Sequence, residues 1–418
     1  MHAFTFLFLA FLAASVLVRL WLNRRQVQHI RSHRHQVPAA FAERIALSDH
    51  QRAADYSCSK LRFGRVNLAW ETLWLLLWTL GGGINLVDQW WNLQEYSLLV
   101  TGIAVIFSVT LISSALDLPF SLYQTFVIEE RFGFNKTTLG TWCADLVKTT
   151  LLLAIIGTPL LAAILWLMNQ AGAYWWIYAW LLWMGFSLTM IWAYPAFIAP
   201  LFNKFSPLAD ETLRARIEKL LDRCGFHSQG VFVVDGSRRS SHGNAYFTGF
   251  GKNKRIVFYD TLLESLSEDE VEAVLAHELG HFKRRHITKS LAISAIVSAA
   301  GFGVLAWLMD SAWFYSSLGV ESASTHAALI LFMMIMPAFT YFVSPLFSAL
   351  SRKHEFEADE FAHTMSDYRA LISALVNLYR DNASTLTPDP LHSMFYDSHP
   401  PASIRIHHLE SIAARPGG

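Results

Sequence analysis

Seven stretches of the chain are apolar over about the length that an α-helix needs to cross a bilayer. A hydrocarbon core roughly 30 Å thick is crossed by about 20 helical residues. The stretches cover residues 3–22, 67–87, 96–116, 149–168, 174–200, 290–308 and 327–350. The first lacks a basic segment before it and is followed by Arg24 and Arg25, so we expect a retained anchor rather than a cleaved signal peptide. The pattern predicts a mainly α-helical, multi-pass integral membrane protein.

Polar residues dominate two blocks, at 201–288 and 351–418, and these blocks divide the chain into four expected parts. The parts are an N-terminal membrane region with five transmembrane helices (1–200), a polar segment (201–288), the sixth and seventh transmembrane helices (289–350) and a polar C-terminal segment (351–418). In the first block, residues 211–224 are typical of a helix, and Ser267 with Glu270 forms a capping box at the start of another helix.

Three β-rich runs lie between these two helices, at residues 230–235, 242–249 and 255–259. The second and third runs are joined by the sequence GFGKNK at residues 249–254, which is typical of a turn. We therefore expect those two runs to pair antiparallel.

Basic residues are distributed unevenly among the connections. Nine Lys and Arg residues lie between the first and second apolar stretches, and Arg131, Lys136 and Lys148 lie between the third and fourth. The connections after the second, fourth and sixth stretches contain none. The positive-inside rule then predicts an outside N-terminus, with both polar blocks in the cytoplasm. The host membrane would be a bacterial inner membrane or the endoplasmic reticulum membrane.

Composition excludes several function classes. Hydrophobic residues make up 53% of the chain and charged residues only 16%, well below the share in soluble domains. Lys+Arg and Asp+Glu are both 33, so the basic excess of a nucleic-acid-binding protein is missing. The three cysteines are too widely spaced for a CxxC metal site or a disulfide framework. The lipid bilayer is an expected partner and nucleic acid is not; the sequence leaves the oligomeric state open.

Residues 277–281 read His-Glu-Leu-Gly-His, an HExxH sequence. Side chains four residues apart share one face of a helix, so His277 and His281 can reach a single metal ion. Glu278 stands beside them, where its carboxylate can polarise a water molecule. Neutral imidazoles suit zinc, a Lewis acid that supports hydrolysis. The motif predicts a hydrolytic zinc site with Glu278 as the general base.

A catalytic zinc site needs a third protein ligand and an open position for water. In the sequence HEFEAD, Glu355 and Asp359 are four residues apart, so one can bind the metal while the other orients a ligand histidine. This spacing is a weak signal, because acidic pairs four residues apart are also common on solvated helices. From the residues alone, Glu357 and His354 therefore remain alternative candidates for the third ligand.

With these motifs in place, the chain resembles the type I CAAX prenyl protease family, which are membrane zinc metalloproteases with seven transmembrane helices. The matching stretches are KLRFG (60–64), TFVIEERFGFNKTTLG (125–140), APLFNKFSPL (199–208), HGNAYFTGFGKNKRIVFYDTLL (242–263), HELGH (277–281), HEFEADEFA (354–362) and SHPPASIR (398–405). They extend over most of the chain.

This resemblance implies a fold, a cofactor and a ligand set. The fold is seven transmembrane helices that enclose a water-filled chamber, with a zincin-like α+β metalloprotease domain and a small antiparallel sheet. One Zn²⁺ per chain is implied, with His277, His281 and Glu355 as ligands and Asp359 supporting the site or donating a proton. Residues 201–288 then form the metalloprotease segment, and residues 351–418 complete the zinc site.

Four further residues gain expected roles from the same resemblance. Asn244 and Ala245 lie on a predicted edge strand, where an extended substrate can add by β-augmentation. His399 and Arg405 can donate hydrogen bonds to the oxyanion that forms during hydrolysis, and Arg405 can also bind a substrate carboxylate.

The function that follows is a membrane-embedded zinc endopeptidase. The implied substrates are peptides or proteins, cut near a prenylated C-terminus. One alternative is a membrane-protein quality-control protease without prenyl specificity. Another is a non-catalytic transporter or chaperone with structural zinc, which Glu278 argues against because a closed structural site has no use for a base.

Overall fold

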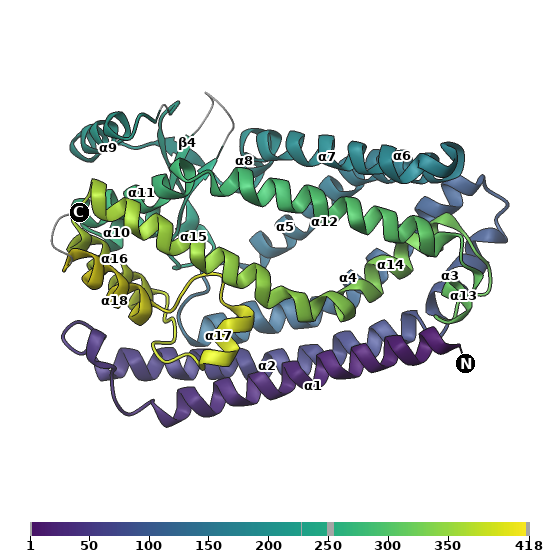
Figure 1. Ribbon diagram of the computed structural model, residues 1–418, viewed down its shortest axis with the longest axis horizontal. Helices are drawn as coiled ribbons and strands as arrows, with labels where there is room; N and C mark the ends of the chain where they lie inside the picture. Colours follow the sequence, from purple (N-terminus) through teal and green to yellow (C-terminus); the bar gives the residue numbers. More distant parts are fainter. Residues whose placement is uncertain (1, 227, 249–254, 415–418) are drawn as a thin grey trace.

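Long helices run lengthwise through the molecule, and a small sheet lies at one end of them (Figure 1). The computed structural model describes residues 2–226, 228–248 and 255–414. The expected turn at residues 249–254 therefore lies outside the described residues.

Within the described part of the chain, six helical segments are long and apolar enough to span a membrane. They are Ala3–Ser32 (α1), Leu98–Glu129, Leu139–Gln170, Gly172–Phe202, His286–Met309 (α12) and Thr325–Met365. Their separate elements are α4 (Leu98–Tyr123), η2 (Gln124–Glu129), α5 (Leu139–Leu152), η3 (Leu153–Gly157), α6 (Thr158–Gln170), η4 (Gly172–Tyr174), α7 (Trp175–Ala193), η5 (Tyr194–Ile198), α8 (Ala199–Phe202), α14 (Thr325–Thr340), η7 (Tyr341–Val343) and α15 (Ser344–Met365). Apolar side chains such as Leu17 and Ile296 stay 66% and 71% exposed, as lipid-facing residues do.

The second predicted stretch, at residues 67–87, does not form one continuous helix. Helix α2 (Leu47–Trp78) ends within it, and α3 (Gly83–Asn92) begins after a turn in which Gly82 has φ +75°. This left-handed conformation costs glycine little. Because α2 begins in the basic segment, it is not among the six apolar segments. Its 32 residues still span about 48 Å at 1.5 Å per residue.

The sheet contains β1 (Phe205–Pro207), β2 (Val231–Val234), β3 (Ala245–Thr248) and β4 (Arg255–Tyr259), in the order β1-β2-β4-β3. Strands β3 and β4 pair antiparallel, as the sequence predicted. Strands β2 and β4 are parallel, so the sheet is mixed and the expectation of an antiparallel sheet is wrong. The chain passes from β2 through η6 (Gly236–Arg238) to the edge strand β3. It then returns as β4, beside β2 and in the same direction.

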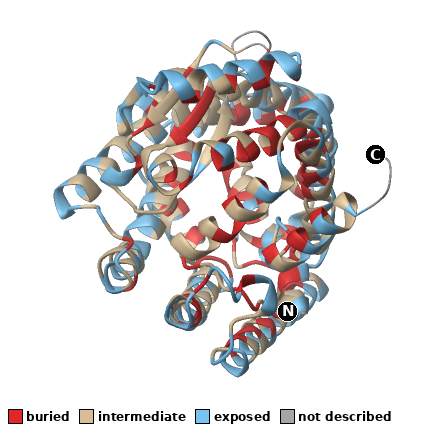
Figure 2. Ribbon diagram, turned by 90° about the vertical axis from the view of Figure 1, so that its left-hand side faces the viewer, coloured by how far each residue is buried: buried red, intermediate tan, exposed pale blue. Residues whose placement is uncertain are grey.

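One apolar core joins the sheet to the helices at the same end of the molecule. It contains buried side chains from α9 (Glu211–Arg223), α10 (Asp260–Ser265), α11 (Glu268–Lys283), α15, α16 (Tyr368–Asp381) and α18 (Ala402–Ala413). A second core lies among the long helices and includes Phe8 and Phe314, the latter in α13 (Ala312–Ser316). Seen from the sheet end, buried residues gather inside and exposed ones face outward (Figure 2). The remaining helices are η1 (Ala39–Phe41) and α17 (Pro390–Tyr396).

Candidate metal centre and active site

The HExxH motif lies in the last turns of α11, a helix fixed at its start and along its buried face. The predicted capping box is present: the Ser267 side chain accepts from the Glu270 backbone N–H, and the Glu270 carboxylate accepts from the Ser267 N–H. The second oxygen of Glu270 accepts a 2.8 Å hydrogen bond from Asn377 of α16. The register of α11 is thereby tied to a neighbouring helix before the motif begins.

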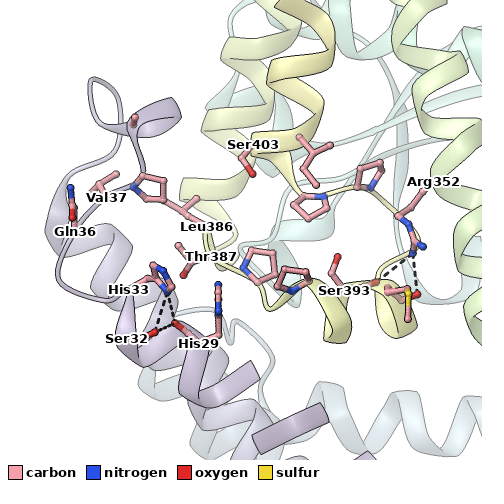
Figure 3. A pocket seen from close by; sticks show the side chains of 18 of the residues that line it. His29, Ser32, His33, Gln36, Val37, Arg352, Leu386, Thr387, Ser393 and Ser403 are labelled. Atoms are coloured by element: carbon pink, nitrogen blue, oxygen red, sulfur yellow. Dashed lines mark hydrogen bonds between the residues drawn. The ribbon is translucent and has the colours of Figure 1, made fainter. Parts of the chain in front are cut away.

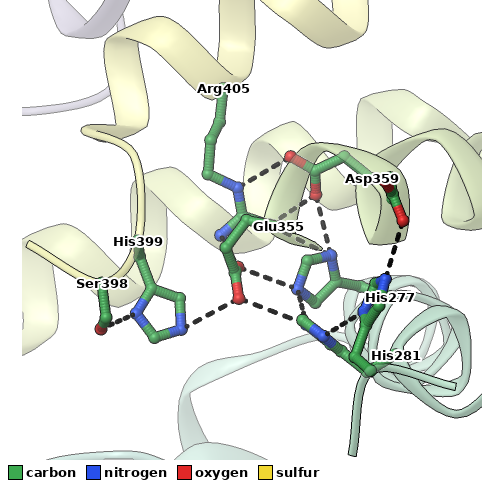
Figure 4. A network of polar contacts seen from close by, with 9 residues as sticks. His277, His281, Glu355, Asp359, Ser398, His399 and Arg405 are labelled. Carbon is green, nitrogen blue, oxygen red and sulfur yellow. Dashed lines mark hydrogen bonds and ion pairs between the residues drawn. The ribbon is translucent and has the colours of Figure 1, made fainter. Parts of the chain in front are cut away.

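Three side chains from α11 and α15 converge on one point (Figure 4). His277 Nε2 lies 3.3 Å from His281 Nε2 and 3.3 Å from Glu355 Oε2, and His281 Nε2 lies 3.3 Å from Glu355 Oε1. This is the one group of three or more metal-binding side chains found in the described part of the chain. Of the three candidates for the third ligand, Glu355, Glu357 and His354, it is Glu355 that lies with the two histidines.

The donor set fits zinc. Ligand atoms about 2.0–2.2 Å from a tetrahedral centre lie roughly 3.3–3.6 Å from one another, which matches the three separations. Glu355 is 3% exposed and its Oε2 lies 3.7 Å from Arg405 Nη1, so the carboxylate stays charged and can bind a cation. Two imidazoles and one carboxylate are also a ligand set typical of hydrolytic zinc sites.

The position of Glu355 depends on close packing between α11 and α15. A Cβ placed on Gly280 would lie 2.9 Å from Ala358 Cα and 3.0 Å from its carbonyl oxygen. The glycine inside the motif therefore lets the two backbones approach. This brings Glu355 and Asp359, both buried on α15, against the histidines of α11.

Behind His277 lies a buried ion pair. Asp359 Oδ1 is 2.8 Å from His277 Nδ1, and the same carboxylate accepts hydrogen bonds from Arg405 Nε at 2.9 Å and Nη2 at 2.5 Å. Burial and the Arg405 guanidinium lower the pKa of His277, but hydrogen bonds to Asp359 and Glu355 outweigh them and raise it to about 9. Arg405 is 7% exposed, so its guanidinium faces the ligands from within the protein.

His399 reaches the same centre from another side. Its Nε2 lies 3.4 Å from Glu355 Oε1, its Nδ1 lies 3.0 Å from Ser398 Oγ, and its side chain is 64% exposed. Unlike Arg405, this imidazole can meet a substrate that enters from solvent.

Arg352 fixes the chain that carries His399, a role the sequence did not indicate. Its Nη1 donates to the carbonyl oxygens of Ser393, Met394 and Asp397 at 3.4, 3.2 and 2.9 Å. The arginine stands on α15 one turn before Glu355, so one helix positions both a candidate ligand and the His399 loop.

A cavity of about 850 Å³ is lined by the C-terminal end of α1 and by Pro400 and Pro401, which follow His399 in the chain (Figure 3). His29, His33 and Arg352 line it, whereas His277, His281 and Glu355 do not. The cavity therefore borders the His399 loop without being the metal centre.

Glu278, the expected general base, follows His277 on α11 and is half-buried.

Asn244 is exposed beside Ala245, the first residue of β3, and β3 is an edge strand as expected. Asn244 Oδ1 accepts from the Ala245 N–H at 2.8 Å, and the Asn244 carbonyl accepts from the Tyr259 N–H at 2.9 Å. Among the described residues, β4 is the one strand that pairs with β3, so β3 lies at the edge of the sheet.

The segment before β3 is held by residues outside the motif. Glu129, in the π-helix η2, accepts from the Tyr56 hydroxyl at 2.8 Å and lies 3.7 Å from His242 Nε2. Asn382 accepts from the Gly243 N–H at 3.1 Å. The acidic cluster at residues 129–130 thus forms structural contacts around the sheet, with Glu130 accepting from a neighbouring asparagine.

Comparison with known proteins identifies the family. Residues 26–204 match the family model described as CAAX prenyl protease N-terminal, five membrane helices, and residues 207–413 match peptidase family M48. The CAAX prenyl protease 1 homolog of Arabidopsis thaliana is 44% identical over 299 residues, covering 71% of this chain and 70% of that protein. The chain belongs to the CAAX prenyl protease family of M48 peptidases.

Similarity to this family extends along the whole chain. The CAAX prenyl protease 1 homolog of Caenorhabditis elegans is 32% identical over 440 residues and covers 98% of each chain. The crystal structure of S. mikatae Ste24p matches with a TM-score of 0.88 and 30% identity, over 98% of this chain and 99% of that one. The resemblance inferred from the motifs is confirmed, and the chain is a membrane-embedded metalloprotease.

Proposed function

We propose that this chain is a zinc endopeptidase of the cytoplasmic membrane face that cuts prenylated proteins near their C-termini. The observation that carries the proposal is the triangle of His277, His281 and Glu355 next to Glu278, which offers three ligands and a base. The substrate class rests on the relatives, which are called CAAX prenyl protease 1 or its homologues in plants, animals and yeast.

The reaction divides among this chain's side chains. A bound zinc ion would polarise both the attacking water and the scissile carbonyl. Glu278 takes the proton of that water and returns it to the leaving amine. His399 donates from its exposed face to the oxygen on which negative charge develops.

Substrate binding falls to the free edge of β3. An extended peptide that pairs with this edge gains backbone hydrogen bonds at Ala245 and reaches the exposed side chain of Asn244. An amide side chain both donates and accepts, so Asn244 suits a peptide backbone.

Asp359 and Arg405 hold the centre in place. The Asp359 carboxylate accepts from His277 Nδ1 and so leaves Nε2 free for the metal. Arg405 neutralises that buried carboxylate through two hydrogen bonds. We therefore assign Arg405 to positioning rather than to direct contact with substrate.

The membrane arrangement belongs to the same proposal. Helix α2 supplies the seventh span, and the helices enclose a chamber. Residues 1–200 and 289–350 form the membrane region. Residues 201–288 form the metalloprotease segment, and residues 351–418 complete the zinc site. The distribution of basic residues supports an outside N-terminus and a cytoplasmic metal centre.

The deciding experiment replaces Glu278 with Gln. This variant keeps the ligands, so zinc stays stoichiometric, while cleavage of a farnesylated peptide falls roughly 10²–10⁴-fold because the amide cannot act as a base. Glu218→Gln, at an exposed position of α9, serves as the control and stays fully active. Near-wild-type cleavage by Glu278→Gln contradicts the mechanism. Equal cleavage of the non-prenylated peptide by the wild type would favour the quality-control alternative.

A further inference from the structure

His281 contacts a second histidine outside the HExxH motif. His281 Nδ1 lies 3.0 Å from His286 Nδ1, and His286 Nε2 lies 2.9 Å from Glu357 Oε2. His286 is the first residue of α12 and is 3% exposed; Glu357 comes from α15. A chain of contacts therefore runs from His281, a half-buried candidate ligand, through the buried imidazole of His286 to a carboxylate.

Hydrogen-bond chemistry gives this chain a direction. With His281 Nε2 turned to the metal centre, the proton of a neutral imidazole lies on its Nδ1, which donates to His286 Nδ1. His286 then carries its own proton on Nε2 and donates it to the Glu357 carboxylate. Each of the two contacts has one donor and one acceptor, so the assignment is consistent from end to end.

The surroundings hold His286 in this orientation. Its ring stacks on His354, with centroids 4.0 Å apart and planes 11° apart. Arg285 has φ +57°, so the chain turns between α11 and α12 just before His286. Lys289 lies 3.7 Å from Glu357 Oε2, the oxygen that His286 contacts, and favours a negative charge there.

We propose that His286 and Glu357 are positioning residues for the metal, which fix the tautomer and ring orientation that present His281 Nε2 to zinc. The inference rests on the proposed zinc function. The two histidine ligands are thus oriented differently. His277 meets its carboxylate, Asp359, directly, whereas His281 meets Glu357 through a second imidazole. The start of α12, an apolar helix long enough to span a membrane, thereby becomes part of the metal site.

The test measures the zinc dissociation constant of the full chain in detergent, by competition with a chromophoric chelator. His286→Phe keeps a flat ring against His354 but removes both nitrogens, and we expect zinc to bind roughly 10–100-fold more weakly. His286→Asn places an amide oxygen near the former Nδ1 position and should recover part of the affinity. Glu357→Ala should weaken binding, and Glu357→Gln, which retains an acceptor, should weaken it less.

Lys353→Gln is the matched control. It removes an exposed cation from the same carboxylate but leaves the chain of hydrogen bonds intact, so the zinc affinity should stay within about threefold. Thermal unfolding of each metal-free variant identifies those that lose their fold.

The outcomes separate this inference from the function on which it rests. A folded His286→Phe that binds zinc as tightly as the wild type overturns the inference. If that variant does not fold, equal zinc affinity in Glu357→Ala and the wild type overturns it instead. A wild-type chain that binds no zinc contradicts the proposed function itself.

Discussion

Gly280 and Ala358 face each other where α11 meets α15, so closely that a Cβ on the glycine would lie 2.9 Å from the alanine Cα. The two residues belong to the two sequence motifs that supply the candidate ligands. Their contact sets the distance between the histidines on α11 and the carboxylates on α15.

Replacing Gly280 with Ala should separate the two helices. The backbone of Ala358 cannot move like a flexible side chain, so we expect about 1–3 kcal/mol of destabilisation together with weaker zinc binding. Thermal unfolding and chelator competition measure these effects. In Gly185→Ala on α7, a Cβ meets nothing within 4 Å, so this control should keep its stability. Unchanged zinc affinity in Gly280→Ala would contradict the role of this contact.

Arg405→Leu should destabilise the protein and reduce its zinc content. The substitution leaves the fully buried Asp359 without its cation, and breaking a buried ion pair costs about 3–5 kcal/mol. Arg405→Lys keeps the charge but loses the bidentate contact with Asp359, so its stability and zinc content should lie between those of the wild type and of Arg405→Leu. Metal analysis and unfolding test this expectation. A variant with full zinc occupancy and only a raised KM would instead support substrate contact.

His399→Ala should lower turnover and leave zinc bound. Its imidazole donates from a largely exposed position, and losing one donor to an oxyanion typically costs roughly 10²–10³ in kcat. His407→Ala, at an exposed position of α18, controls for the loss of a histidine. Loss of zinc from the His399 variant would make this residue a ligand instead.

Asp389 should give the protein a pH-dependent stability. Burial raises the pKa of its carboxyl, but hydrogen bonds from Arg25 at 2.9 and 3.3 Å and from the His392 N–H at 3.0 Å lower it below its ordinary value. The stabilisation is therefore complete at pH values above the ordinary pKa and is lost as the pH falls through the folded-state pKa.

Asp389→Asn should destabilise the chain by about 1 kcal/mol at pH 7, because the amide can still cap α17 but cannot pair with Arg25 as an anion. The difference from the wild type in thermal unfolding should shrink below about pH 4. A difference that stays constant with pH would show that the charge of Asp389 contributes nothing.

Single cysteines test the orientation. In a background without the native three, cysteines at the exposed Gln94 and Ser322 should react with an impermeant thiol reagent on intact cells or sealed vesicles. A cysteine at Glu218 should react only after permeabilisation. The reverse pattern would contradict the proposed topology.

Local features of the site could be predicted from the sequence because they depend on helical periodicity. The capping box at Ser267 and the shared face of His277 and His281 are relationships within a single helix, and both are present. The choice of Glu355 over Glu357 is not local. It depends on how α15 rotates against α11, which the close packing at Gly280 determines.

The features that were missed involve contacts between distant segments. Nothing in the runs of residues that form β2 and β4 reveals that they pair in parallel, because strand order depends on the path of the chain between them. The contacts of Arg352 with carbonyl groups after α17 leave no pattern in the sequence. The glycines at residues 81–83, by contrast, are a signal from which the interruption of the second apolar stretch could have been predicted.

The metal centre is assembled from segments far apart in the chain: His277 and Arg405 are 128 positions apart. Both α12 and α14 lie between the HExxH helix and Glu355. During synthesis, both of these apolar helices are therefore translated before the third donor. The complete set of three candidate ligands thus exists only in a chain whose apolar segments have all been translated.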